Sequence, residues 1–152
     1  MLEARNLVNQ QLDALLTEET DVIANMANAA ALLHQTLEDI NWVGFYRYVK
    51  ENDELILGPF QGNVACMHIK NGTGVCGTAL TNREVLRVSD VTKFAGHIAC
   101  DANSRSEIVI PLYKGDHIYG VIDIDSPIVD RFSEEDEKDL TEFGEVFLQH
   151  VD

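Results

Sequence analysis

The sequence predicts an α+β domain in which helices near both ends flank a mainly antiparallel sheet. Three observations predict this fold class: helical spacing of apolar residues near both ends, strand-like segments in the middle, and polar turns between neighbouring strands. The length of 152 residues is typical of one domain, which we expect to span residues 1–152. The apolar content of 45% is sufficient for a hydrophobic core.

The predicted helices lie near the two ends of the chain. Residues 17–21 offer capping side chains, so they divide the N-terminal part into two helices. The apolar positions of these two helices are Val8, Leu12, Leu15 and Leu16, then Val22, Met26, Ala30, Leu33 and Leu37. Ser133 is the expected N-cap of a C-terminal helix, because three acidic residues follow it. The apolar stripe of that helix consists of Leu140, Phe143, Phe147 and Val151.

The middle of the chain is predicted to form the sheet. Aromatic and β-branched residues mark the strands, and the Lys114-Gly115-Asp116 turn joins the clearest hairpin. The predicted strands cover residues 41–49, 55–61, 85–88, 108–113 and 117–125. A long, mostly irregular segment between the predicted strands 55–61 and 108–113 contains all three cysteines, and such insertions are usually functional.

Charge and composition exclude several classes of function. The formal net charge is −15, which disfavours binding to nucleic acids and to anionic membrane surfaces. Most of this charge lies on the predicted helices, because residues 41–125 contain ten acidic and eight basic residues. No apolar run is long enough to span a membrane, and residues 1–5 do not resemble a signal peptide. Three cysteines without a secretion signal predict a reducing, cytoplasmic location.

Two strands carry side chains that could form a binding site. Trp42, Gly44 and Tyr46 share one strand face, where Gly44 would leave a notch between two rings for a thioether, a sulfoxide methyl or a cation. An aromatic core face that Gly44 allows to pack closely is the alternative interpretation. Asp123 and Asp125 also share a face, with Tyr119 and Val121, and could bind an ammonium group or a polarised oxygen. Alternatively, this strand simply ends in an Asp-rich turn.

The three cysteines allow redox chemistry or metal binding. Cys76 follows a glycine-rich loop at a predicted helix start, which would lower the pKa of its thiol, and Cys100 has an imidazole nearby. A buried structural role is the alternative for each cysteine. Cys66 and His68 with His97 and Cys100 could also form a Cys2His2 metal site, although the Cys66–His68 spacing is irregular for zinc.

Four motifs in the same order resemble those of the free methionine-(R)-sulfoxide reductases, which are single GAF domains. They are Trp42-Val43-Gly44-Phe45-Tyr46, Gly74-Val75-Cys76-Gly77-Thr78-Ala79, Gly96-His97-Ile98-Ala99-Cys100-Asp101 and Gly120-Val121-Ile122-Asp123-Ile124-Asp125-Ser126-Pro127. The resemblance covers residues 7–148 and implies a six-stranded antiparallel sheet around a small enclosed pocket. Ala95 departs from the proline that the family often has there, which affects the stiffness of the loop and not the chemistry.

The resemblance also implies a role for each candidate residue. Cys100 would be the nucleophile, Cys66 the main resolving thiol and Cys76 a third thiol able to join disulfide exchange. Glu107, Asp123 and Asp125 would be the pocket carboxyl groups, while Trp42 and Tyr46 would hold the methyl-sulfur end of the substrate. The implied reaction reduces free L-methionine (R)-S-oxide to L-methionine without a metal or organic cofactor.

The implied reaction cycle passes through a sulfenic acid and an intramolecular disulfide, with thioredoxin as the reductant. A small-molecule sensing module is the rival function, and the Cys2His2 metal site is a third hypothesis. A homodimer is compatible with a GAF domain, but no interface can be identified from the sequence.

Overall fold

The computed structural model describes residues 6–98 and 100–151. Residues 1–5 and Asp152 of the predicted domain, and Ala99 of the third motif, therefore lie outside the described residues. The helices are α1 (Leu7–Leu16), α2 (Val22–Thr36), α3 (Gly74–Asn82) and α4 (Glu134–Leu148), with short 3-10 turns at Lys50–Asn52 and Val91–Lys93. The strands are β1 (Trp42–Val49), β2 (Glu54–Gly62), β3 (His68–Lys70), β4 (Leu86–Val88), β5 (Ser106–Lys114) and β6 (His117–Ser126).

The sequence signals at the helix ends are confirmed. Asp21 caps α2 by accepting a hydrogen bond from the backbone N–H of Ala24. The Ser133 hydroxyl caps α4 by accepting a hydrogen bond from the backbone N–H of Asp136, and the Asp136 carboxylate accepts one from the backbone N–H of Ser133, so that the two residues form a capping box. Within the part of the chain that is described, the helices fall short of the length and apolarity that crossing a membrane requires.

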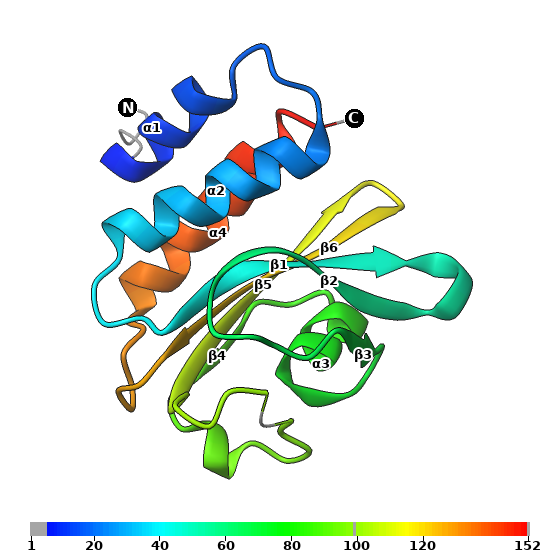
Figure 1. Ribbon diagram of the computed structural model, residues 1–152, viewed down its shortest axis with the longest axis vertical. Coiled ribbons are helices and arrows are strands. Elements are labelled where there is room, and N and C mark those ends of the chain that lie inside the picture. Colours follow the sequence, from blue (N-terminus) through cyan, green and yellow to red (C-terminus); the bar gives the residue numbers. More distant parts are fainter. Residues whose placement is uncertain (1–5, 99, 152) are drawn as a thin grey trace.

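All six strands form one antiparallel sheet in the order β3-β2-β1-β6-β5-β4. The expected α+β architecture is therefore confirmed. Sequence periodicity missed β3, a three-residue edge strand that pairs with the start of β2. In Figure 1, α2 and α4 lie across one face of the sheet with α1 beside them, whereas α3 covers the other face.

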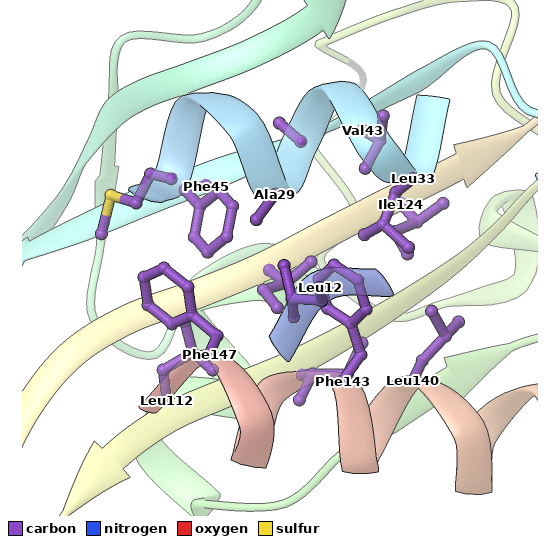
Figure 2. Packing of buried hydrophobic residues seen from close by; sticks show 14 of the residues in the cluster. Leu12, Ala29, Leu33, Val43, Phe45, Leu112, Ile124, Leu140, Phe143 and Phe147 are labelled. Carbon is purple, nitrogen blue, oxygen red and sulfur yellow. The ribbon is translucent and has the colours of Figure 1, made fainter. Parts of the chain in front are cut away.

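The two faces of the sheet bury separate clusters of side chains. Val43, Phe45 and Ile124 pack against the helices, as Figure 2 shows around Phe143 and Phe147. Trp42, Tyr46, Val109 and Val121 lie on the opposite face, where α3 packs. The alternation of side chains along the strands thus separates the apolar, helix-covered face from the face that contains the candidate site.

One prediction of side-chain direction on β6 is wrong. Tyr119 packs with the helix-side cluster and Ile118 with the α3-side cluster, the reverse of what strict alternation predicts. The cause is an irregularity in the ladder, since Leu112 pairs with Gly120 but Tyr113 pairs with Ile118. Gly120 has a φ of 145°, and a Cβ there would collide with the backbone of Tyr46. The expected alternation of Val121, Asp123 and Asp125 begins beyond this bulge.

Candidate active site

Pairing between strands brings the three predicted carboxyl groups together. Asp125 lies opposite Glu107 on β5 and opposite Trp42 on β1. Asp123 occupies the next row, opposite Val109 and Gly44. All three acids are buried, with relative exposures of 6% for Glu107, 6% for Asp123 and 8% for Asp125. Asp123 and Asp125 are therefore not the exposed turn residues of the alternative interpretation.

Cys76 extends this cluster from the opposite side. It is the third residue of α3, and its Sγ atom lies 3.9 Å from Oε2 of Glu107. One ligand atom each from Cys76, Glu107 and Asp123 lies within 4.8 Å of the others. Burial raises the pKa of the Cys76 thiol well above its usual value, and the neighbouring carboxylates, Asp123 first, raise it further. The predicted lowering of its pKa by the helix start is wrong, because burial and negative charge outweigh the helix dipole.

The carboxyl groups differ in how firmly they hold protons. Burial raises the pKa of Glu107 well above its usual value, and the charges of Asp123 and Asp125 raise it further. Burial also raises the pKa of Asp123, but hydrogen bonds from Glu107 and Cys76 act in the opposite direction. Burial also raises the pKa of Asp125 well above its usual value, and the charges of Asp123 and Asp101 raise it further. These directions favour the protonated forms of Glu107 and Asp125 and make Asp123 the favoured position for negative charge.

The other two cysteines form a disulfide beside the cluster. Cys66 lies between β2 and β3, Cys100 lies in the segment before β5, and their Cα atoms are 5.4 Å apart. Cys76 is a free, buried thiol. The disulfide engages both thiols that the Cys2His2 alternative would require, so in this state neither is available as a metal ligand.

The aromatic residues of β1 are close-packed. Trp42 stacks on Phe60 with ring centroids 5.2 Å apart and on Tyr46 at 5.8 Å. A Cβ on Gly44 would overlap Phe60 and lie 2.9 Å from the Trp42 ring, so the position requires glycine. The expected notch above Gly44 is therefore occupied by these rings. The Tyr46 hydroxyl donates a hydrogen bond of 2.9 Å to the carbonyl oxygen of Cys66, which links the aromatic face to the disulfide.

A small cavity of about 30 Å³ lies between these groups. Tyr46, Cys76, Cys100, Glu107 and Asp123 border it. The remaining lining residues come from β3, from loops and from the start of α3: Ile69, Thr73, Gly74, Val75, His97 and Ile98. Cys66, Trp42 and Asp125 lie in the surrounding structure and do not border the cavity.

Sequence reasoning missed the residues that anchor the Cys100 segment. Asn41, just before β1, donates one hydrogen bond of 3.1 Å to Asp101 and another of 3.2 Å to Ser104. The backbone N–H of Asn41 also donates to the carbonyl oxygen of Asp125. Asn41 is separated from Asp101 by 60 positions, so the only available signal was its place directly before the aromatic motif.

Comparison with known proteins agrees with this geometry. The model of the GAF domain family matches residues 11–150. The chain is 53% identical to the free methionine-R-sulfoxide reductase of Escherichia coli over 88% of this chain and 79% of that protein. The chain belongs to the free methionine-R-sulfoxide reductase family of GAF domains. A family member from Saccharomyces cerevisiae is 41% identical over 88% of this chain and 78% of that protein.

Solved structures of the free methionine-R-sulfoxide reductase family have the same fold. The reduced form of fRMsr from Staphylococcus aureus superposes with a TM-score of 0.91 and 48% identity, covering 99% of this chain and 97% of the other. The enzyme from Neisseria meningitidis in complex with its substrate superposes with a TM-score of 0.90 and 38% identity, covering 99% and 93%. The expected family and its single-domain α+β fold are thus confirmed.

Proposed function

We propose that this protein reduces free L-methionine (R)-S-oxide to L-methionine by cysteine thiol chemistry, acting as one GAF domain. The observation that carries the proposal is the Cys66–Cys100 disulfide next to a cavity bordered by the buried carboxyl groups of Glu107 and Asp123. Relatives at 53% and 41% identity named free methionine-R-sulfoxide reductase support the substrate class.

The first step transfers oxygen from the substrate to Cys100. The Cys100 thiolate attacks the sulfoxide sulfur, and the sulfoxide oxygen needs a proton before its bond to sulfur can break. Glu107 is suited to supply this proton, because burial and the charges of Asp123 and Asp125 raise its pKa. The hydroxyl group then moves from the substrate sulfur to Sγ of Cys100 as the new sulfur–sulfur bond breaks. Its electron pair stays on the substrate sulfur, so methionine leaves as the thioether and Cys100 remains as a sulfenic acid.

The second step forms the disulfide. The Cys66 thiol attacks the Cys100 sulfenic acid, a Cys66–Cys100 bond forms, and the oxygen leaves as water. An external dithiol, for which we propose thioredoxin, then reduces this bond by thiol–disulfide exchange and becomes a disulfide itself. Cys76 borders the same cavity as Cys100, which supports a role for it as a third thiol in this exchange.

We infer that the substrate enters the reduced protein. A cavity of about 30 Å³ holds only about one or two water molecules, much less than methionine sulfoxide. Reduction of the disulfide would free the segment that contains Cys100. The negative charge favoured on Asp123 would attract the substrate ammonium. Tyr46, which borders the cavity, would contact the methyl-sulfur end, with Trp42 stacked against it from behind.

The deciding experiment uses separated R and S epimers of methionine sulfoxide, each both free and within a peptide. With a thioredoxin system present, we expect methionine to form only from the free R epimer. An enclosed site explains the exclusion of the peptide. Turnover of the S epimer, or of peptide-bound substrate at a similar rate, would contradict the proposal.

Cysteine variants separate the two steps. Cys100→Ser should lose methionine formation entirely, while Cys66→Ser should release one equivalent of methionine and then recycle slowly. Normal recycling by Cys66→Ser would make Cys76 the resolving thiol.

A homodimer and a cytoplasmic location stay predictions, which gel filtration and cell fractionation can test.

A further inference from the structure

The carboxyl–thiol cluster has the composition and spacing of a zinc site. Cys76, Glu107 and Asp123 each offer one ligand atom, all within 4.8 Å of one another, and Sγ of Cys76 is 3.9 Å from Oε2 of Glu107. Zinc bonds of about 2.3 Å to sulfur and about 2.1 Å to oxygen place neighbouring ligands about 3.5 Å apart in a tetrahedron. Small side-chain shifts would therefore complete three bonds to one ion.

A second observation independently indicates a missing partner at this place. Asp123 borders the cavity, and one of its two carboxylate oxygens, Oδ1, is buried without a hydrogen-bond partner. An unsatisfied buried oxygen is unfavourable, so it indicates a ligand that the site can accept. The cavity of about 30 Å³ has room for one ion and a water molecule, which would be the fourth ligand.

The ligand set discriminates between metal ions. Magnesium and calcium prefer sites made only of oxygen atoms, whereas a thiolate favours zinc. The three protein ligands would carry three negative charges when ionised, which the divalent ion largely offsets. The open fourth position is also typical of zinc sites that are not purely structural.

We propose that Cys76, Glu107 and Asp123 bind one zinc ion and that this ion inhibits the protein. Zinc binding needs only the three side chains, whereas the inhibition rests on the proposed reductase function. The ion would take the place of the proton that Glu107 donates to the sulfoxide oxygen. It would also occupy the carboxylate of Asp123 that would otherwise attract the substrate ammonium.

The oxidised protein permits a test without interference from the other thiols. With the Cys66–Cys100 disulfide intact, Cys76 is the single remaining thiol of the three cysteines. Equilibrium dialysis of this form against Zn²⁺ should give one bound equivalent. Cys76→Ser and Asp123→Asn should each weaken binding at least about tenfold, and the exposed Asp116→Asn should leave it unchanged.

Cobalt gives a second readout that needs no variant. Co²⁺ bound by the oxidised wild-type protein should show the near-ultraviolet charge-transfer absorbance of a cobalt–thiolate bond, and added Zn²⁺ should remove it. Absence of this band overturns the proposal even if the variants fail to fold. Zinc binding that is equally strong in Cys76→Ser and Asp123→Asn places the ion elsewhere and also overturns it.

Activity measurements then distinguish the inhibition from the proposed function. The initial rate in metal-free buffer should fall when Zn²⁺ is added and recover with a chelator. Zinc binding without any sulfoxide reduction in metal-free buffer would refute the function and leave the site standing. Sulfoxide reduction that is insensitive to saturating Zn²⁺ would overturn the inhibition.

Discussion

The two faces of the sheet use the same strands, but the α3 face buries three carboxyl groups beside its apolar cluster. On β6, Ile122 and Ile124 join the cluster beneath the helices, while Asp123 and Asp125 occupy the alternating positions of the other face. Burying an apolar group stabilises the fold, whereas burying a carboxyl group costs free energy unless it keeps its proton or finds a partner. The comparison indicates that the helix-covered face stabilises the fold, whereas the buried carboxyl groups of the α3 face lower its stability and provide reactive groups.

The largest expected effect tests the chemical role of the α3 face. Glu107→Gln keeps the size of the side chain but removes its acidic proton. Single-turnover methionine formation should therefore slow by about 100- to 10,000-fold. The exposed Glu84→Gln is the matched control and should react at the wild-type rate. A normal rate for Glu107→Gln would assign proton donation to another group.

The next effect tests the structural role of the helix-covered face. Phe45 is fully buried and lies 5.0 Å from Phe147 between ring centroids. Phe45→Ala should lower the free energy of unfolding by about 3–5 kcal/mol, measured by denaturant titration. Phe60→Ala, at a half-buried position on the other face, should cost less. Equal losses would show that both faces contribute equally to stability.

The pH dependence of stability should differ between the faces. The pKa of Asp125 is raised in the folded state, so the protonated side chain contributes to the free energy of unfolding. This contribution is fully present below about pH 4, the pKa of Asp125 in the unfolded chain. It is lost as the pH rises through the higher pKa of the folded state. Asp125→Asn removes this loss. The variant should match the wild type near pH 4 and exceed its stability by on the order of 1–3 kcal/mol at alkaline pH.

Denaturation midpoints across the pH range give the measurement for Asp125→Asn. The exposed Asp116→Asn serves as the control and should follow the wild-type curve. A stability difference for Asp125→Asn that stays constant from acid to alkaline pH would show that packing, and not the buried charge, accounts for it. The same variant should reduce activity, which would connect the stability cost to function.

Local sequence rules predicted most elements but only part of the site. Alternation placed Asp123 and Asp125 on one face correctly, because the strand is regular beyond Gly120. It failed for Tyr119, since the bulge depends on the contact between Gly120 and β1. Nothing in the pattern around Glu107 distinguished it, and only the family resemblance indicated it. The pKa of Cys76 was mispredicted because its neighbours come from strands more than thirty positions away.

The smallest effect concerns Asn41, which anchors the segment that contains Cys100. Asn41→Ala removes the hydrogen bonds to Asp101 and Ser104, which should cost about 1 kcal/mol of stability. Because the Cys100 segment then samples more positions, disulfide formation after sulfenic acid formation should slow by a few-fold.

Rapid mixing of the reduced protein with substrate separates these steps. Methionine release by Asn41→Ala should stay near the wild-type rate, while loss of the second thiol is delayed. The exposed Asn52→Ala, which removes one surface hydrogen bond to Glu54, is the control for a general loss of stability. If Asn41→Ala slows both steps equally, then Asn41 holds the Cys100 segment in its reactive position for the sulfoxide as well as for Cys66. The hydrogen bonds of Asn41 would then support sulfoxide reduction at the α3 face as well as the later formation of the disulfide.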